Sequence, residues 1–318
     1  MVLSVVVPVY DEADVLPLLV ERLRPVLDRL DRPYEVVAVD DGSTDTSAAL
    51  LEGFRRVWPQ LRVIGLRANS GHQAALSAGL VRARGEWVVT MDADLQDPPE
   101  LVGEMLRTAE ASDVDVVYAV RADRSTDTFF KRRTAAMFYA LMRRLAGSQV
   151  PANAGDFRLM SRATVDAVNR LPEQNRVLRL AVPALGFPST TVAYERAARA
   201  AGGTKYTLAR MLRLSLDSVT GFSVAPLRAA TWCGFLGMFC ALALIAYALV
   251  SWALGHTTPG WTSTFATVVG VGAVQLFCLG LLGEYVGRMY LAAQGRPSYF
   301  VAYDSLVSES RTRVPDLR

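Results

Sequence analysis

The stretch WVVTMDADLQDPPE, residues 87–100, joins a short apolar run to three aspartates, an amide and two prolines. The apolar residues 87–91 are typical of a buried strand, so the aspartates follow where that strand should end. No lysine or arginine within the stretch neutralises them. Carboxylates this close repel one another unless they face open water or hold a cation. The stretch therefore predicts either a solvated turn or a cation site at a strand exit.

The rest of the first half alternates short apolar runs with helical patterns. The runs are rich in Val and Ile and are continuous in apolar residues, which is typical of parallel strands covered on both faces. Strands are expected over residues 3–9, 34–39, 61–66, 87–91 and 114–119, and helices over 15–30, 47–58, 73–83 and 100–109. We therefore predict an α/β fold with a Rossmann-like, mostly parallel sheet.

Acidic segments follow three of the expected strands, at residues 10–14, 40–45 and 92–97. Open parallel sheets bind ligands beyond the carboxyl ends of their strands, so these segments should converge on one crevice. No G-x-G-x-x-G or Walker loop follows the first strand, which weakens a dinucleotide-binding or P-loop interpretation.

Within the third acidic segment, Asp92, Asp94 and Gln96 form the pattern D-x-D-x-Q. In a nearly extended chain, alternate side chains share one side. Hard oxygen donors on one side suit Mg²⁺ or Mn²⁺, with a diphosphate completing the coordination shell. We predict a metal-diphosphate site here, although the D-x-D pair alone is equally typical of a surface turn.

Charged residues vanish from the sequence between Arg228 and Glu284. The uncharged run 229–255 would extend about 40 Å as a helix, whereas the hydrocarbon core of a bilayer needs only about 30 Å. A second uncharged run, 261–283, is also long enough to cross, and a short segment with Pro and Gly separates the two. We predict a transmembrane hairpin, the alternative being two buried core helices.

Basic residues flank both runs, whereas the loop between them has no Lys or Arg. By the positive-inside rule, the N- and C-termini are expected in the cytoplasm and the protein in the inner, cytoplasmic membrane. Residues 207–228 combine apolar positions with Arg210, Arg213 and Asp217, which favours an amphipathic interfacial helix. The expected organisation is a cytoplasmic domain over 1–206, this helix over 207–228, the hairpin over 229–283 and a cytoplasmic tail over 284–318.

The formal net charge of +3 says little by itself, but basic residues cluster within 121–144 and again within 196–213. Such clusters suit phosphates or anionic lipid head groups, and ordinary solvated helix faces are the alternative. No nucleic-acid partner is predicted.

Seven segments in order along the chain resemble family 2 glycosyltransferases of GT-A fold. Within that family they are similar to the polyprenyl-phosphate glycosyltransferases, a group that includes bactoprenol glucosyltransferase and dolichol-phosphate mannose synthase. The segments are VVVPVYDEAD (5–14), VDDGSTD (39–45), NSGHQAALSAG (69–79), MDADLQDPPE (91–100), GDFRLM (155–160), YERAARAAGGTKY (194–206) and GEYVGRMY (283–290).

The resemblance implies an inverting transfer of a hexose from a nucleotide sugar to polyprenyl phosphate, such as undecaprenyl phosphate, at the cytoplasmic face of the membrane. It favours UDP-glucose or a related UDP-sugar as donor, with a GDP-mannose-dependent mannosyltransferase as the alternative. It also suggests a homotetramer. A catalytically inert membrane scaffold that keeps this fold is a competing hypothesis of another class.

The resemblance also implies roles for particular residues. The nucleotide pocket would be lined by Pro8, Tyr10, Glu12, Asp40 and Asp41. An Mg²⁺ or Mn²⁺ ion on the diphosphate would be held by Asp92, Asp94 and Gln96. The segment DDGSTD also reads as a turn at Gly42, with Ser43 or Thr44 capping the next helix, and both roles can hold at once.

In GDFRLM, the resemblance makes Asp156 the base of a single-displacement attack on the anomeric carbon, with Arg158 beside it. A phosphate monoester has its second pKa near about 6, so the acceptor is already largely deprotonated at neutral pH. Orientation and screening of two anions therefore matter more than proton removal. The cations expected around the donor diphosphate and the acceptor phosphate are Arg121, Arg132, Arg133, Arg199 and Lys205.

Other enzyme classes fit the sequence less well. A processive polysaccharide synthase would carry Q-x-x-R-W, but the nearest stretch, EQNRVLRL, lacks the Trp. A sugar nucleotidyltransferase would carry a Gly-rich loop after the first strand, and VVVPVYDEAD has no Gly. Of the two histidines, His72 follows Gly71 at an expected helix start, which is typical of a capping or packing position, so a Ser-His-Asp hydrolase is not predicted.

Overall fold

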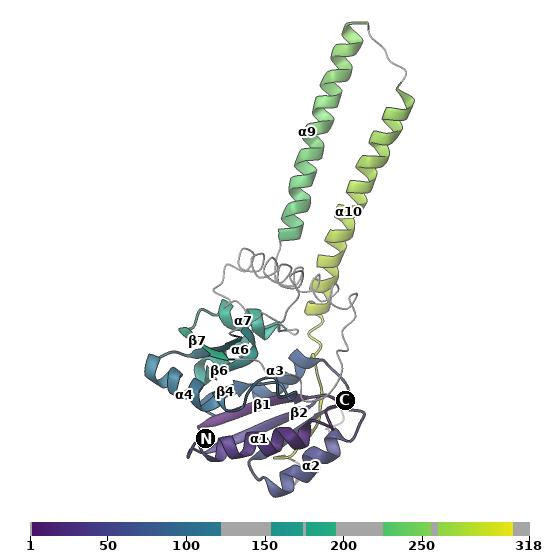
Figure 1. The fold of residues 1–318 in the computed structure, drawn as a ribbon. Coiled ribbons are helices and arrows are strands. Elements are labelled where there is room, and N and C mark those ends of the chain that lie inside the picture. The colour runs from purple at the N-terminus through teal and green to yellow at the C-terminus, as the bar shows by residue number, and fades with distance from the viewer. Residues whose placement is uncertain (1, 122–153, 174–175, 195–224, 256–259, 308–318) are drawn as a thin grey trace. The chain divides into compact units, whose positions relative to one another are not determined.

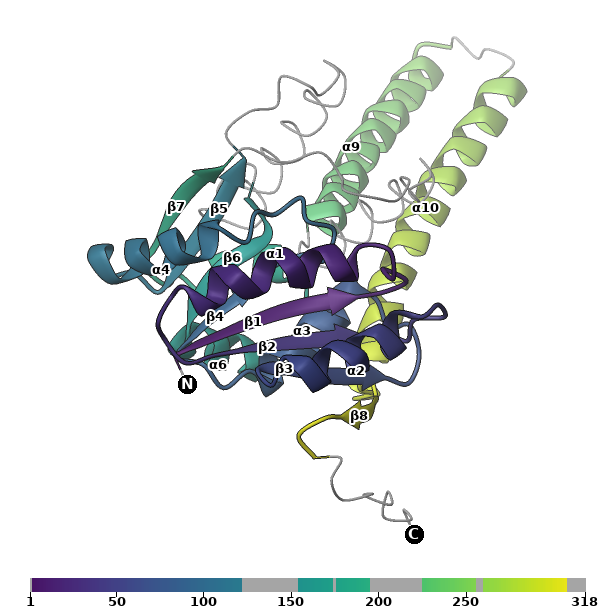
Figure 2. The same cartoon turned by 60° about the horizontal axis from the view of Figure 1, so that its bottom comes forward.

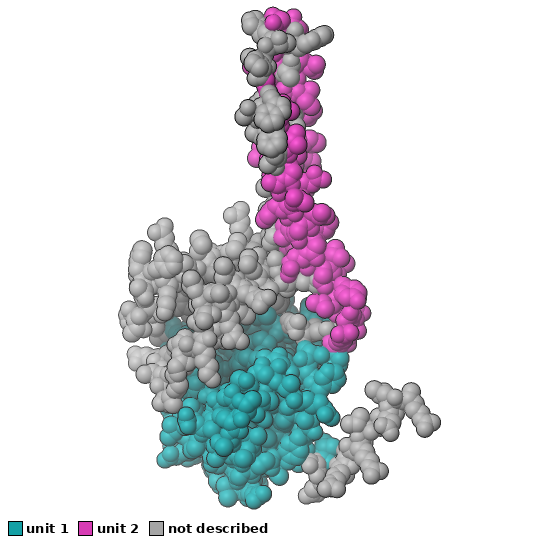
Figure 3. Space-filling view, turned by 90° about the vertical axis from the view of Figure 1, so that its right-hand side faces the viewer, with its two compact units in different colours: residues 1–204, 297–318 teal, residues 205–296 magenta. Residues whose placement is uncertain are grey.

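The computed structural model describes residues 2–121, 154–173, 176–194, 225–255 and 260–307 (Figure 1). The chain divides into two compact units (Figure 3). Unit 1 comprises Met1–Thr204 together with Pro297–Arg318, and unit 2 comprises Lys205–Arg296. The chain thus returns to the first unit at Pro297.

Unit 1 is built on an eight-stranded sheet of order β7-β5-β6-β4-β1-β2-β3-β8. Neighbouring strands are parallel except around β6 and at β8, which pair antiparallel with their neighbours. The strands are β1 (Leu3–Val9), β2 (Tyr34–Asp40), β3 (Leu61–Leu66), β4 (Trp87–Thr90), β5 (Val116–Arg121), β6 (Ala154–Ser161), β7 (Ser189–Tyr194) and β8 (Val301–Asp304). This architecture confirms the predicted α/β fold with a mostly parallel sheet.

Helices cover both faces of this sheet (Figure 2). On β1, Val5 and Val7 face one side of the sheet and Val6 faces the other, as the strand period of two requires. The first side packs against α1 (Leu16–Asp28), α2 (Ser47–Val57) and α4 (Leu101–Ser112), and the second against α3 (His72–Arg82), α6 (Arg162–Arg170) and α7 (Leu178–Ala184). The continuous apolar strands are thus explained by burial on both faces.

The strand order reverses at β1. The chain runs from β1 to β2 and β3 in one direction, and then α3 carries it back so that β4 pairs on the other side of β1. Helix α3 lies close to the sheet at Gly79, where an added Cβ would collide with the Val6 side chain. A reversal of this kind opens a crevice at the carboxyl ends of the strands. The three acidic segments begin at those ends.

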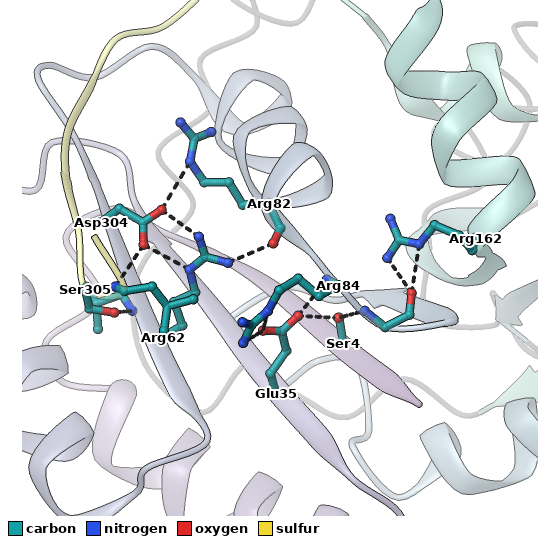
Figure 4. A network of polar contacts seen from close by, with 11 residues as sticks. Ser4, Glu35, Arg62, Arg82, Arg84, Arg162, Asp304 and Ser305 are labelled. Carbon is teal, nitrogen blue, oxygen red and sulfur yellow. Dashed lines mark hydrogen bonds and ion pairs between the residues drawn. The ribbon is translucent and has the colours of Figure 1, made fainter. Parts of the chain in front are cut away.

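A buried polar cluster lies at the amino ends of the strands. The Ser4 hydroxyl on β1 donates to Glu35 on β2 at 2.7 Å and accepts the Gly85 N–H at 2.7 Å. The Arg84 backbone N–H and guanidinium also donate to Glu35 (Figure 4). The buried carboxylate is therefore fully partnered, as burial of a charge requires.

The edge strand β8 is fixed by ion pairs with β3. Arg62 donates twice to Asp304, at 2.9 and 2.6 Å, and the guanidinium of Arg82 lies 3.4 Å from the same carboxylate (Figure 4). Ser305 accepts the Val63 N–H at 3.0 Å. Residues 284–318 were predicted only as a tail, and in the structure this part of the chain adds a strand that covers the edge of β3.

Unit 2 contains two long helices, α9 (Ala225–Ala253) and α10 (Trp261–Ala293). Their segments 230–251 and 270–293 are long and apolar enough to cross a membrane, and neither segment has a buried residue in the described structure. The exposure argues against the alternative of two buried core helices. Helix α10 continues beyond residue 283 to Ala293. Of the predicted amphipathic helix, residues 207–224 lie outside the described residues, and 225–228 form the first turn of α9.

Candidate functional site

The exits of β1 and β2 are joined by hydrogen bonds. Asp11 has a left-handed backbone (φ 52°), and its carboxylate accepts the Thr44 N–H at 2.7 Å. The Glu12 N–H donates to the Ser47 hydroxyl at 2.9 Å. Tyr10 is 38% exposed at this edge, and Pro8 is buried within β1. The first two acidic segments therefore lie together, as the fold predicted.

The two aspartates at the end of β2 hold the surrounding turns. Asp40 accepts the Ser43 N–H at 3.0 Å, and Asp41 accepts the N–H groups of Ser70 and Gly71 at 2.7 and 2.9 Å. Burial raises the pKa of Asp41, and the two N–H donors counteract part of that rise. Asp41 thus fixes the loop that leads into α3.

Gly42 turns the chain with φ 69°, and an added Cβ would lie 2.7 Å from the carbonyl carbon of Ala68. The turn in DDGSTD was therefore predicted correctly. The predicted cap by Ser43 or Thr44 is wrong, because α2 begins only at Ser47. Ser43 instead accepts the Asp11 N–H at 3.1 Å, which joins the β1 and β2 exits.

The third acidic segment divides into two sets of side chains. Asp97 is buried, accepts the Tyr194 hydroxyl at 2.8 Å and accepts the Asp92 N–H at 3.4 Å. Burial, followed by the charge of Asp97, raises the pKa of Tyr194 to about 12. Asp97 therefore accepts hydrogen bonds that stabilise the turn after β4. Asp92, Asp94 and Gln96 form the other set.

These three side chains offer two carboxylates and one amide. Gln96 is 9% exposed, and its backbone N–H donates to the Asp94 carboxylate at 3.1 Å. Leu95, between them, has a left-handed backbone (φ 58°). Burial raises the pKa of Asp92 to about 6, His72 opposes the rise, and Asp97, Asp156 and Asp94 add to it. The described residues contain no cluster of three or more His, Cys, Asp or Glu with metal-site geometry. Carboxylate and amide oxygens are nevertheless the kind of hard donor that Mg²⁺ and Mn²⁺ prefer.

Asp156 lies at the same edge of the sheet as the acidic segments because β6 is antiparallel to β4. Thr90 at the end of β4 pairs with Arg158, so Asp156 lies just beyond the β4 carboxyl end, beside the third acidic segment. Arg158 is 1% exposed and donates to Asp156 at 2.8 Å, and its charge is further stabilised by the Tyr118 ring at 5.8 Å. The predicted pairing of Asp156 with Arg158 is present in the structure.

Two residues at the start of α3 complete the surroundings of Asp156. The Nε2 atom of His72 lies 3.3 Å from Asp156 and 3.7 Å from Asp92, and Gln73 donates to Asp156 at 3.1 Å. Sequence reasoning assigned His72 to capping or packing and did not single out Gln73. The available signal was their position in NSGHQAALSAG, which leads from a strand exit into a helix.

Charge keeps Asp156 ionised. Burial alone would raise its pKa, but the hydrogen bond to His72 and the charges of Arg158 and Arg179 hold the pKa well below its usual range. For His72, burial favours the neutral form, yet the hydrogen bond to Asp156 and the charge of Asp92 outweigh it and raise the pKa. Arg179 was not predicted. It stands at the start of α7, and its Nε is buried without a hydrogen-bond partner among the described residues.

Of the five predicted cations, only Arg121 lies among the described residues. Arg121 ends β5 opposite Tyr194 on β7, and its charge acts on the Tyr194 hydroxyl that donates to Asp97. Its Nε is buried without a hydrogen-bond partner among the described residues. The structure therefore associates Arg121 with Tyr194 and Asp97. Four further predicted cations lie outside the described residues, namely Arg132, Arg133, Arg199 and Lys205.

Comparison with known proteins identifies two family regions. Residues 4–168 match glycosyl transferase family 2, and residues 225–289 match the GtrB C-terminal hairpin. The glycosyltransferase YkcC of Bacillus subtilis (strain 168), whose specific activity is uncharacterised, is 42% identical over 94% of this chain and 92% of its own. An SfII prophage-derived bactoprenol glucosyl transferase of Shigella flexneri is 34% identical over 95% of this chain and 97% of its own.

Among solved structures, glucosyl-3-phosphoglycerate synthase from Mycobacterium tuberculosis, in complex with Mn²⁺, UDP and phosphoglyceric acid, has a similar fold. The TM-score is 0.52 at 18% identity, over 69% of this chain and 76% of that one. At this identity the likeness concerns the fold alone. The family match covers the crevice up to α6, and the relatives align along nearly the whole chain. The chain therefore belongs to glycosyl transferase family 2.

Proposed function

We propose that the protein transfers a hexose from a nucleotide sugar, UDP-glucose or a related UDP-sugar, to polyprenyl phosphate with inversion at the anomeric carbon. The observation that carries this proposal is the contact of His72 with both Asp92 and Asp156, at 3.7 and 3.3 Å. This contact joins the D-x-D-x-Q segment to GDFRLM in one crevice. Similarity to bactoprenol glucosyl transferases along nearly the whole chain supports a lipid phosphate as acceptor.

The donor end of the crevice is formed by the exits of β1 and β2. Pro8 lies near the end of β1 and is followed by Tyr10 and Glu12, and Asp40 ends β2 and is followed by Asp41. Half-exposed Tyr10 offers a packing surface for a base, and the aspartates can accept hydrogen bonds from it. A divalent Mg²⁺ or Mn²⁺ held by Asp92, Asp94 and Gln96 would neutralise charge on the diphosphate leaving group.

In the reaction, an oxygen of the acceptor phosphate forms a bond to the anomeric carbon as the bond from that carbon to the diphosphate oxygen breaks. The electron pair leaves on the nucleoside diphosphate, so the products are this diphosphate and the lipid-linked sugar. The second pKa of the acceptor phosphate is about 6, so this group is already largely deprotonated at neutral pH and needs no general base. Asp156, held ionised by Arg158 and His72, is a weak base, and it acts by orienting the acceptor and the sugar.

The two apolar helices deliver the lipid acceptor. Their length and exposure, and the match to the GtrB hairpin, support a chain that is integral to the membrane. Basic residues at their outer flanks support a cytoplasmic location for both termini and for the site. The cations at 132, 133, 199 and 205 would then bind phosphates near the head groups. A homotetramer stays a prediction from the resemblance.

A donor panel tests the proposal. Purified full-length protein is incubated with undecaprenyl phosphate, Mn²⁺ or Mg²⁺, and UDP-glucose, other UDP-sugars or GDP-mannose, and the lipid extract is analysed by mass spectrometry. Incorporation from a UDP-sugar is expected. Incorporation from GDP-mannose alone would establish the alternative mannosyltransferase. No incorporation from any donor would favour the inert scaffold.

A further inference from the structure

Both ends of the Gln73 side-chain amide are bound. Its Nε2 donates to Asp156 at 3.1 Å, and its Oε1 accepts the backbone N–H of Leu178, at the start of α7, at 2.9 Å. An ionised carboxylate only accepts and a backbone N–H only donates, so these partners fix the orientation of the amide. An ionised Glu of the same length cannot donate, and Met offers no donor and only a weak sulfur acceptor, so neither meets both requirements.

Arg158 closes these contacts into a ring. It donates to the second carboxylate oxygen of Asp156 at 2.8 Å and to the carbonyl oxygen of Leu178 at 2.8 Å. Leu178 thus gives its N–H to Gln73 and its carbonyl to Arg158. The ring connects β6, α3 and α7, and each member restricts its neighbours. Each oxygen of the Asp156 carboxylate therefore has its own fixed donor.

The ring is connected to the donor end of the crevice. Asp41 holds the N–H groups of Ser70 and Gly71, and Gly71, with φ 95°, directly precedes α3. Asp41, at the end of β2, thus fixes the start of α3, and with it Gln73, through the two loop residues Ser70 and Gly71. The Gln73 side chain then donates to Asp156 on β6, which lies on the other side of the point where the strand order reverses.

We propose that Gln73 is a positioning residue of the transfer reaction. It holds the Asp156 carboxylate in the orientation that the acceptor requires, and it anchors the start of α7, where Arg179 stands. The inference rests on the proposed function of Asp156. It concerns turnover rather than donor binding, since Gln73 lies between Asp156 and α7 and not at the exits of β1 and β2.

Two substitutions distinguish the two hydrogen bonds of the Gln73 side-chain amide, one to Asp156 and one to Leu178. Gln73→Glu keeps an acceptor for Leu178 but sets a carboxylate against Asp156, and Gln73→Met removes both hydrogen bonds at similar length. In full-length protein with UDP-glucose and undecaprenyl phosphate, kcat should fall about tenfold or more for Gln73→Glu, while KM for UDP-glucose stays within about twofold. The exposed Gln60, which directly precedes β3 at the amino ends of the strands, gives the matched control Gln60→Glu with unchanged kcat.

A double variant distinguishes positioning from folding. In Gln73→Glu/Asp156→Asn the donor and the acceptor exchange places, so the hydrogen bond can form again in the reverse direction. The Tm lost in Gln73→Glu should return in the double variant, whereas kcat should stay as low as in Asp156→Asn. Recovery of both would mean that the Asp156 carboxylate is not required, which would refute the proposed role of Asp156 and, with it, the positioning role of Gln73.

The remaining outcomes separate this inference from the proposed function. Wild-type turnover by Asp156→Asn would refute the proposed role of Asp156. Loss of turnover in Asp156→Asn, with wild-type turnover in both Gln73 variants, would overturn the positioning role and leave the proposed function intact. If both Gln73 variants lowered Tm and kcat together and also raised KM for UDP-glucose, Gln73 would be purely structural. That result would also overturn the positioning role.

Discussion

The imidazole Nε2 of His72 lies 3.3 Å from the carboxylate of Asp156, although the two residues come from different elements and are far apart in the sequence. The same nitrogen lies 3.7 Å from Asp92. His72 therefore stands between the carboxylate expected to hold a cation and the one expected to face the acceptor. Its raised pKa favours a positive charge that reduces their mutual repulsion.

Loss of this imidazole should slow transfer. We expect His72→Ala to lower kcat by about tenfold to a hundredfold, because Asp156 loses one donor and faces Asp92 without screening. His72→Gln, which keeps a neutral donor, should lose less. Steady-state kinetics with UDP-glucose measure both variants, and His256→Ala, at the other histidine, is the control. Equal rates for His72→Ala and the control would refute a role for His72.

The pairing of β8 with β3 should contribute to the stability of unit 1. Asp304 is 9% exposed in its side chain and meets Arg62 at 2.6 Å. Because Asp304→Asn leaves Arg62 without its counter-charge, it should lower the free energy of unfolding by about 3 kcal/mol. Thermal unfolding of the full chain in detergent measures the loss, with Asp14→Asn at an exposed aspartate as control. An unchanged Tm for Asp304→Asn would show that the ion pair does not stabilise the domain.

This contribution should depend on pH. Burial alone would raise the pKa of Asp304, but the hydrogen bond and charge of Arg62, the Leu306 N–H and the charge of Arg82 lower it. The folded-state pKa thus lies below the unfolded value of about 3.9, so the stabilisation is present above about pH 4 and is lost as the pH falls through the folded-state pKa. The difference in Tm between wild type and Asp304→Asn should stay constant from pH 7 to pH 5 and shrink below pH 4.

Membrane orientation can be tested by labelling. In a background with Cys233, Cys240 and Cys278 replaced by Ala, an impermeant maleimide added to intact cells should label Thr257→Cys, between the two apolar runs, and not Asp14→Cys. After permeabilisation both should react. Labelling of Asp14→Cys alone in intact cells would reverse the orientation.

The sequence predicted the parallel part of the fold closely, because local patterns decide it. Continuous apolar runs marked β1 to β5, and their acidic exits converged as parallel strands require. The antiparallel β6 was not predicted as a strand, since its direction depends on pairing with β4 and β5. β8 was missed for the same reason, because only four residues form it and Arg62 and Asp304 are 242 positions apart.

The candidate site shows the same limit. The D-x-D-x-Q residues were found from a pattern whose chemistry is evident in the residue types, whereas Asp156 and Arg158 were found from the resemblance of GDFRLM to the family. His72 and Gln73 gave no such signal, because imidazoles and amides at a helix start usually cap or pack, and their contact with Asp156 exists only once α3 and β6 meet. Asp97 accepts the hydroxyl of Tyr194 on β7, a residue that no local pattern places beside it.

The central claim is that the acidic crevice transfers sugar to a lipid phosphate with the help of a divalent ion. Asp94→Ala tests it most directly, since it removes one expected ligand and leaves Asp156 and its ring unchanged. Labelled glucose from UDP-glucose is followed into undecaprenyl phosphate across a Mn²⁺ titration, with Asp113→Asn, at an exposed aspartate just after α4, as control. We predict Mn²⁺-dependent transfer by wild type and a loss of about a hundredfold or more in Asp94→Ala. Transfer by Asp94→Ala at the wild-type rate and with the same Mn²⁺ dependence would contradict the account.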